Sequence, residues 1–177
     1  MSFAVMQPYL FPYLGYYQLV NAVNKFVFYD DVTFIKGGYI NRNNILSNNS
    51  AQRFTIPVPG MSSNKLINEL CFDTNIKKIL KSIEQNYKKA PYFEQVFPLI
   101  VSVLTDDNRS VENVCSKSIT AVFEYLELTK SFYFSSQLNY QRDLSPADKL
   151  IAMSDVLESK EYINSPGGKS LYDKEYF

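Results

Sequence analysis

The sequence predicts an α/β fold in which a Rossmann-like parallel sheet lies between two layers of helices. Two observations lead to this prediction. An apolar run at Phe3–Met6, a helical pattern after Gly15 and a second apolar run at Lys25–Tyr29 form a βαβ unit, the building block of parallel sheets. Further apolar runs then alternate with helical patterns towards the end of the chain.

The first loop and helix follow from the residues between these two strands. Pro8 and Pro12 each lack an N–H and fix φ, so the chain leaves the first strand in a tight loop. After Gly15, apolar side chains recur at the spacing of one helix face, at Tyr16, Leu19, Val20 and Val23. Ligands of parallel sheets bind beyond the carboxyl ends of the strands. The loops after both predicted strands are therefore the first candidates for a binding site.

The middle of the chain predicts two short strands followed by three helices. The strands are expected at Arg53–Val58 and Lys65–Phe72. Apolar residues then repeat with helical period, which predicts helices at Thr74–Lys89, Tyr92–Leu104 and Ser110–Leu128. We therefore expect a helical segment inserted at about residues 74–128 of the α/β domain.

The last part of the chain predicts two more strands with a helix between them. The strands are expected at Ser131–Ser135 and Glu161–Asn164. Ser145 and Pro146 are residue types preferred at the N-cap and at the first helical position, so the helix begins there and runs to about Leu157.

Composition limits the classes of function. A chain of 177 residues can form one domain, residues 1–177, with a substantial core. The 18 basic and 18 acidic side chains cancel, which argues against a sequence-independent nucleic-acid binder. No apolar run is long enough to span a bilayer, and no signal-peptide pattern is present, so we expect a cytoplasmic protein. Cys71 and Cys115 are expected to be buried thiols.

The chain contains no histidine. Ser-His-Asp and Cys-His catalysis, a histidine general base and histidine-ligated zinc are therefore excluded. Acid–base chemistry would have to come from Asp, Glu, Lys, Tyr or Cys. The 14 tyrosines suit flat ligands such as nucleotides and sugars, although protein cores use tyrosine as well.

Two loops have the composition of anion-binding loops. In the loop at 30–44, Gly37 and Gly38 permit close backbone approach, and Lys36 and Arg42 flank them. After the last predicted strand, a Gly-Gly-Lys turn would present backbone N–H groups to an anion. The glycine spacing of a P-loop is absent there. The alternative for the loop at 30–44 is a solvated surface loop, and the alternative for the Gly-Gly-Lys turn is an ordinary turn. In each case composition supports anion binding and the alternative about equally.

Two long motifs, at Met6–Leu19 and Asp31–Asn43, resemble the WbqC-like family, and the match continues through Tyr87–Phe93 and Asn164–Tyr172. Members of this family are associated with bacterial surface-polysaccharide (O-antigen) gene clusters. The resemblance implies a role in modifying amino sugars, for example by adding a glycyl or another acyl group. Family members are typically longer than this chain, and its last residues, Lys174–Phe177, resemble the middle of a motif. We therefore expect a truncated or naturally short member, and the sequence leaves open whether residues beyond Phe177 complete the site.

A second resemblance is to the nucleotidyltransferase superfamily, whose first strand leads into a His-x-Gly-His loop that opens a helix. The equivalent spacing here is Tyr13–Tyr16, and Ile163–Lys169 corresponds to the superfamily's late helix-capping loop. This resemblance implies a nucleotidyltransferase-like sheet. Tyrosine cannot carry positive charge at neutral pH, so Lys36, Arg42 and Lys169 would have to supply it. Nucleotidyl transfer is therefore implied less strongly than the fold.

The predicted site residues form two sets. The catalytic set is Asp30, Asp31, Lys36 and Arg42. The ligand-binding set is Gln7, Tyr9, Tyr13, Gly15, Tyr16, Asn41, Asn43, Gly167, Gly168 and Lys169. No metal-ligating residue is assigned. The cofactor stays undetermined, and a nucleotide with Mg²⁺ is the option that the loops favour.

Three functions remain open. The first is a transferase, for an aminoacyl, acyl or nucleotidyl group, whose small-molecule substrate is a nucleotide-activated amino sugar. The second is a module that binds a nucleotide or sugar without chemistry. The third is a structural partner in a biosynthetic complex, such as a homo-oligomer, with the tyrosine-rich loop as its interface.

Overall fold

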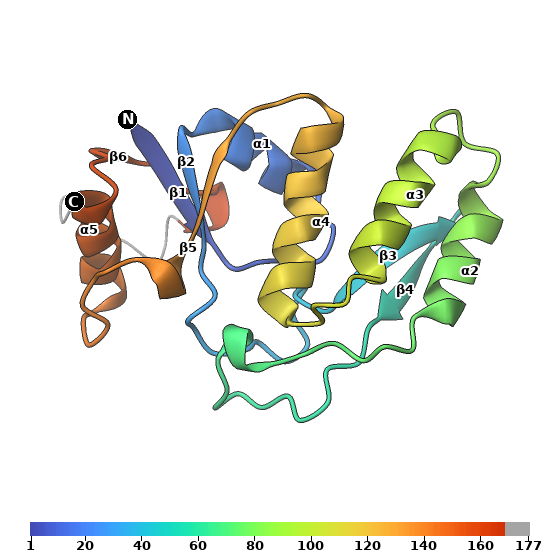
Figure 1. Cartoon of the computed structure of the whole chain (residues 1–177), viewed down its shortest axis with the longest axis horizontal. Coiled ribbons are helices and arrows are strands. Elements are labelled where there is room, and N and C mark those ends of the chain that lie inside the picture. The colour runs from blue at the N-terminus through green and yellow to red at the C-terminus, as the bar shows by residue number, and fades with distance from the viewer. Residues whose placement is uncertain (169–177) are drawn as a thin grey trace. The chain divides into compact units, whose positions relative to one another are not determined.

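Four parallel strands form the sheet of the first of two units into which the chain divides. The computed structural model describes residues 1–168. Unit 1 contains residues 1–7, 13–30 and the chain from Leu128 onwards, and unit 2 contains Pro8–Pro12 and Asp31–Glu127. The predicted α/β class with a mainly parallel sheet is confirmed (Figure 1). The expectation of a single domain with a helical segment at 74–128 stays a prediction.

Unit 1 holds the elements predicted from the apolar runs at both ends of the chain. Its strands are β1 (Ser2–Met6), β2 (Lys25–Phe28), β5 (Ser131–Phe134) and β6 (Glu161–Tyr162). Its helices are α1 (Leu14–Ala22), α5 (Pro146–Val156) and the 3₁₀ turns η2 (Ser135–Gln137) and η3 (Pro166–Gly168). The strand order is β5-β2-β1-β6, and every pairing is parallel.

Side chains alternate between the two faces of this sheet and bury a helix on each. Phe3 and Val27 belong to a cluster with Met153 of α5. On the other face, the ring of Phe26 lies 5.5 Å from that of Tyr16 on α1. Figure 1 shows α1 and α5 on opposite sides of the strands. Unit 1 therefore has the three layers expected of a Rossmann-like sheet.

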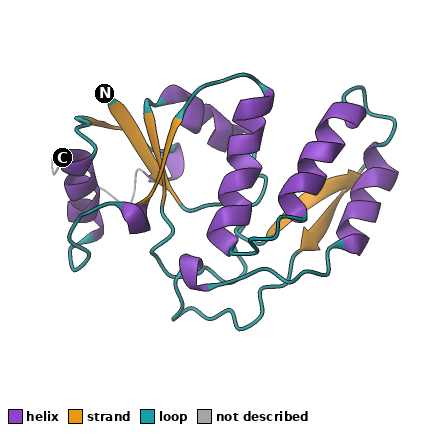
Figure 2. Ribbon diagram, viewed as in Figure 1, coloured by secondary structure: helices purple, strands orange, loops and turns teal. Residues whose placement is uncertain are grey.

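Unit 2 combines a β-hairpin with helices (Figure 2). Its strands are β3 (Arg42–Ser47) and β4 (Ser50–Thr55). Its helices are the 3₁₀ turn η1 (Ile67–Glu69), α2 (Lys77–Tyr87), α3 (Phe93–Leu104) and α4 (Val111–Tyr125). The three α-helices lie close to their predicted positions, and α3 continues through Pro98. Ile45 and Phe54 of the hairpin pack against the apolar core of this unit.

One loop prediction and one strand prediction in unit 2 are wrong. The loop predicted at 30–44 overlaps β3, which begins at Arg42 and pairs with β4. Asn48 and Asn49 between the two strands both have positive φ, which is the type I′ geometry of a two-residue hairpin turn. The expected strand at Lys65–Phe72 is a 3₁₀ turn flanked by isolated bridges. Arg53–Val58 overlaps β4, which begins three residues earlier, at the hairpin turn, and ends three residues earlier because Pro57 cannot donate to the ladder.

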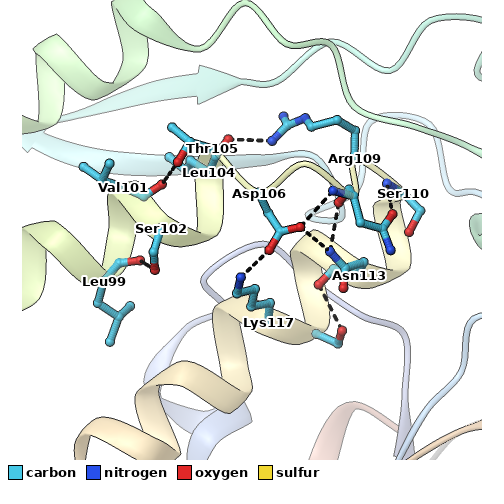
Figure 3. A network of polar contacts seen from close by, with 12 residues as sticks. Leu99, Val101, Ser102, Leu104, Thr105, Asp106, Arg109, Ser110, Asn113 and Lys117 are labelled. Atoms are coloured by element: carbon cyan, nitrogen blue, oxygen red, sulfur yellow. Dashed lines mark hydrogen bonds and ion pairs between the residues drawn. The ribbon is translucent and has the colours of Figure 1, made fainter.

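A polar network fixes the junction between α3 and α4 (Figure 3). The Asp106 carboxylate accepts hydrogen bonds from the backbone N–H of Asn108 at 2.9 Å and from Asn113 Nδ2 at 3.2 Å, and it pairs with Lys117. Arg109 donates to the Leu104 carbonyl at 2.5 Å. The hydrogen bond from Lys117, reinforced by its charge, lowers the pKa of Asp106. The bond from Arg109 satisfies a carbonyl that the end of α3 leaves without a partner, and the bond from Asn108 closes the turn between the helices.

The cysteine prediction is right for Cys115 and wrong for Cys71. Cys115 lies fully buried on α4, where its thiol donates to the Ile40 carbonyl at 3.2 Å. Burial, and to a smaller extent the Glu112 carboxylate, raises the pKa of this thiol well above its ordinary value. Cys71 is exposed, because its segment is not a buried strand but a single bridge with Ser110.

Within residues 1–168, no helix combines the length and the hydropathy that a membrane span requires.

Candidate functional site

The carboxyl ends of all four strands of unit 1 meet at one edge of its sheet, because the strands are parallel. From β1 the chain moves outward to β2 and β5, and it then returns to the opposite side of β1 as β6. The gap between two neighbouring strands whose connections leave in opposite directions is called the switch point, and it is the usual ligand-binding crevice of an open parallel sheet. The candidate site of unit 1 therefore lies at the carboxyl ends of β1 and β6.

Gln7 follows β1 directly and carries a polar atom without a partner. Its Oε1 atom is buried and has no hydrogen-bond partner among residues 1–168. Its backbone carbonyl accepts a 2.9 Å hydrogen bond from the hydroxyl of Tyr16, a core residue. A buried amide oxygen costs free energy unless a donor reaches it. A ligand hydroxyl or amine is the kind of group that Gln7 can accept from.

The N-terminus of α1 lies in the loop that follows Gln7. Tyr13 is the N-cap residue, and its side chain is exposed and makes no capping hydrogen bond. A Cβ atom at Gly15 would clash with the Tyr13 ring, so glycine allows the ring to lie against the first turn of the helix. The first turn contains no acidic side chain. Burial raises the pKa of the neighbouring Tyr17 far above its ordinary value.

Asp30 lies at the carboxyl end of β2 and is almost completely buried, at 1% exposure. One carboxylate oxygen accepts from Ser135 Oγ at 2.9 Å and from the backbone N–H of Ser136 at 3.0 Å. The other accepts from Ser136 Oγ at 2.6 Å. The backbone N–H of Asp30 in turn donates to Ser135 Oγ at 3.1 Å. Asp30 therefore ties the end of β2 to the end of β5.

Sequence reasoning missed the partners of Asp30. Ser135 and Ser136 begin η2, directly after β5. Arg142 donates to the carbonyls of these two serines at 3.2 and 3.0 Å, and its guanidinium lies 4.7 Å from the centre of the Tyr140 ring. The available signal was a pair of serines at the end of a predicted strand, at the same sheet edge as Asp30.

The turn after β6 is partly described. The backbone N–H of Ser165 donates to Asn164 Oδ1 at 2.8 Å, and Pro166–Gly168 form η3. Gly167 is exposed. Lys169, which we predict to bind a ligand, lies outside the described residues, as does the predicted helix start that follows it. The turn thus stands at the carboxyl end of the strand that borders the switch point.

Two predicted ligand-binding asparagines in unit 2 make hydrogen bonds to the backbone. Asn41 is buried, and its Nδ2 donates to the Ile56 carbonyl at 2.9 Å. Asn43 Nδ2 donates to the carbonyls of Leu10, at 3.0 Å, and of Phe11. Asn41 thus closes the base of the hairpin, and Asn43 holds the Pro8–Pro12 segment.

Arg42, between these asparagines, differs from them. Its Nε atom is buried and finds no hydrogen-bond partner within the described chain. Its guanidinium carbon lies 5.9 Å from the centre of the Tyr39 ring, which is 6.5 Å from the ring of Tyr9. Gly37 has a φ of 75°, and a Cβ there would lie 3.8 and 3.9 Å from the two terminal nitrogens of Arg42.

The predicted site residues are divided between the two units. Gln7, Tyr13, Gly15, Tyr16, Asp30, Gly167 and Gly168 belong to unit 1, whereas Tyr9, Asp31, Lys36, Asn41, Arg42 and Asn43 belong to unit 2. Asp31 is half-buried and Lys36 is exposed. Their roles, and the meeting of the loops, stay predictions. The described part of the chain holds no group of three or more acidic or cysteine side chains arranged to bind a metal ion.

Comparison with known proteins places this chain in a family. The profile of the WbqC-like protein family matches residues 7–177. The uncharacterized protein Rv1507c of Mycobacterium tuberculosis is 24% identical over 178 aligned residues, which cover 98% of this chain and 76% of that protein. No solved structure matches the chain. The chain therefore belongs to the WbqC-like protein family.

Proposed function

We propose that this chain is a transferase of bacterial surface-polysaccharide biosynthesis that binds a nucleotide-activated amino sugar at the sheet edge of unit 1. One observation carries the proposal: the buried Oε1 of Gln7 has no partner in residues 1–168, and it stands where β1 borders the switch point. The hydroxyl groups of sugars and riboses are hydrogen-bond donors. A buried amide oxygen can accept a hydrogen bond from one of them in place of water. Membership of the WbqC-like family supports the polysaccharide context.

A nucleotidyltransferase-like sheet is part of this proposal. Residues Tyr13–Tyr16, the counterpart of that superfamily's signature, stand at the start of α1 after the first strand. Tyr16, however, is buried and bonded to the Gln7 carbonyl, and a tyrosine in place of histidine brings no positive charge. We therefore favour nucleotide binding combined with acyl or aminoacyl transfer over nucleotidyl transfer.

In such an acyl transfer, the sugar amine nitrogen forms a bond to the acyl carbonyl carbon. The bond between that carbon and the donor's leaving group breaks, and the amine proton passes to a base. Asp30 already accepts three hydrogen bonds, which suits it to positioning the strand ends. Asp31, the next residue along the chain, is the carboxylate that we propose for the base. In unit 1, the Gly167-Gly168-Lys169 turn is proposed to contact anionic groups of the ligand. Lys36 and Arg42 belong to unit 2 and are proposed to contact an anion there. A cytoplasmic location stays a prediction.

A binding protein without catalytic activity is the second candidate. It is favoured by the three hydrogen bonds that the Asp30 carboxylate already accepts and by the absence of histidine from the sequence. Turnover separates the two candidates. A transferase converts the bound nucleotide sugar when an acyl donor is supplied, whereas a binding module returns it unchanged.

The proposal is tested by isothermal titration of the protein with UDP, dTDP and nucleotide-activated amino sugars with a free amine, such as UDP-glucosamine, with and without Mg²⁺. We expect saturable binding of at least one nucleotide sugar. Gln7→Met keeps the volume of the side chain but removes the acceptor, and it should weaken binding about tenfold or more, because one buried hydrogen bond is lost.

Gln18→Met is the matched control, because Gln18 is an exposed residue of α1. This variant should bind like the unmodified protein. Equal affinities of the Gln7→Met variant and the unmodified protein for every ligand that binds would contradict the proposed site.

A further inference from the structure

Arg42 is a cation of unit 2 that has no acidic partner within residues 1–168. The Nε of Arg42 is buried and has no acceptor there. A guanidinium is always charged, and it carries five N–H donors in a plane that matches an oxyanion in a bidentate manner. A buried N–H without an acceptor is costly, so the position calls for an acceptor from outside the chain.

The ring of Tyr39 lies against the guanidinium of Arg42. The Arg42 guanidinium carbon is 5.9 Å from the centre of the Tyr39 ring, within the range of a cation–π contact. Tyr39 is 55% exposed, and its ring lies 6.5 Å from that of Tyr9. A cation–π contact of this kind uses none of the guanidinium N–H groups as donors, so they stay available to acceptors. The exposed part of the Tyr39 ring can at the same time contact the apolar face of a sugar.

Gly37 lies beside the terminal nitrogens of Arg42. A Cβ atom at this position would already lie 3.8 and 3.9 Å from the two nitrogens, so a longer side chain would reach them. The φ of 75° at Gly37 is a conformation that glycine adopts without strain. Lys36, the preceding residue, is exposed and adds positive charge to the same loop.

We infer that Arg42, Tyr39 and Gly37 form an oxyanion-binding site of unit 2, which takes a carboxylate or phosphate carried by a sugar. Arg42 binds the oxyanion through its N–H groups, Tyr39 fixes the guanidinium plane and contacts the sugar, and Gly37 keeps the approach open. The inference goes beyond the proposed transferase function. It concerns residues of unit 2 alone, and it holds whether or not unit 1 binds a nucleotide.

The test is an NMR titration that follows the Nε–H signal of Arg42 in the ¹⁵N-labelled full chain. The probes are glucose 1-phosphate, glucuronate and, as a neutral control, glucose. The Arg42 signal is identified by its loss in Arg42→Lys. We expect it to shift saturably with at least one anion and to stay unchanged with glucose. The two anions distinguish a phosphate site from a carboxylate site, and either result supports an oxyanion site.

Three variants test the geometry. Gly37→Asp places a carboxylate within reach of Arg42 and should weaken anion binding at least tenfold, whereas Gly37→Asn tolerates positive φ, adds similar bulk without charge and should weaken it less. Arg53→Lys changes an exposed guanidinium on β4 and should have no effect. Backbone amide spectra of each variant verify that it is folded.

The inference is overturned if the Arg42 signal stays unchanged with both anions, or if glucose shifts it equally. Gly37→Asp binding as tightly as the unmodified protein would also overturn it. Gln7→Met should leave this titration unchanged, so failure of the nucleotide site in unit 1 and failure of the anion site in unit 2 give different results.

Discussion

Asp30 of unit 1 and Arg42 of unit 2 are both charged residues of loops that the sequence predicts to bind a ligand, yet the fold treats them in opposite ways. Asp30 is buried with three donors on its carboxylate. Arg42 has a buried Nε that no acceptor reaches within residues 1–168. The difference teaches that a buried charge whose hydrogen bonds are complete holds the fold, whereas one with vacant donors is available to a ligand.

Removing the Asp30 carboxylate should have the largest effect on stability. Asp30→Ala leaves two serine hydroxyls and a backbone N–H at the end of β5 without their acceptor, so we expect the free energy of unfolding to fall by about 3 kcal/mol. Urea denaturation measures this loss. Asp143→Ala, at an exposed position of the same unit, is the control and should change the stability by less than about 0.5 kcal/mol. A loss below about 1 kcal/mol for Asp30→Ala would contradict the view that this carboxylate stabilises the fold.

Asp106 sharpens the comparison, because it has as many partners as Asp30 but lies nearer to solvent. Its side chain is 18% exposed, and that of Lys117 is 40% exposed. Asp106→Ala should lower the free energy of unfolding by about 1.5 kcal/mol, because the carboxylate caps the turn before α4. Lys117→Met should lower it by only about 0.5 kcal/mol, because solvent screens the ion pair. Thermal unfolding of both variants checks these values, and a larger loss for Lys117→Met than for Asp106→Ala would contradict the ranking.

The same carboxylate predicts an acid sensitivity. The pKa of Asp106 is lower in the folded protein than the unfolded value of about 3.9. Its contribution is therefore complete above that unfolded value and is lost as the pH falls through the folded pKa. Between pH 5 and pH 2, as an order-of-magnitude window, the unmodified protein should lose more stability than Asp106→Asn. Parallel stability curves for the two proteins would show that Asp106 does not contribute to the acid transition.

Gln7 should behave oppositely to Asp30. Its Oε1 is buried without a donor in the described chain, so Gln7→Met removes an unsatisfied group at little change of volume. We expect the free energy of unfolding to rise by about 1 kcal/mol. Differential scanning calorimetry of Gln7→Met beside Gln18→Met measures the gain. A clear loss of stability in Gln7→Met would mean that Gln7 has a structural role, like Asp30.

Arg42 should give the smallest change in stability. Arg42→Gln loses a cation–π contact with Tyr39 but also removes a buried N–H without an acceptor, so the two effects nearly cancel. We expect a change within about 0.5 kcal/mol, measured by urea denaturation in the absence of anions. A loss comparable to that of Asp30→Ala would place Arg42 among the structural charges.

The parallel sheet of unit 1 could be predicted because its information is local. The runs at Phe3–Met6 and Lys25–Tyr29 are apolar and short, and the pattern between them has a single helical face. In unit 2, β3 could not be predicted, because Arg42–Ser47 is mostly polar and gains its structure from pairing with β4 through the turn at Asn48 and Asn49. Pairing energy between strands is a property of both partners, which one segment does not reveal.

For the candidate site, the positions of the loops were predictable but the bonding of their side chains was not. Asp30 follows its strand as expected, whereas its partners Ser135 and Ser136 stand more than a hundred residues further along the chain. Asn41 and Asn43 looked like ligand-binding residues from composition, and they donate to backbone carbonyls. Which polar groups remain without a hydrogen-bond partner depends on these long-range bonds. Only the three-dimensional structure therefore distinguishes Gln7 and Arg42 from neighbouring polar residues whose hydrogen bonds are formed.

The central claim, that polar groups without a partner mark the ligand sites, is tested most directly by an NMR titration with UDP-glucosamine that follows the side-chain amide of Gln7. The backbone N–H of Ser136, which is bonded to Asp30, serves as the internal reference. The account predicts a saturable shift of the Gln7 amide signals and a much smaller shift of the Ser136 signal. Unchanged Gln7 signals, together with a shift confined to Asp30 and its serine partners, would contradict it.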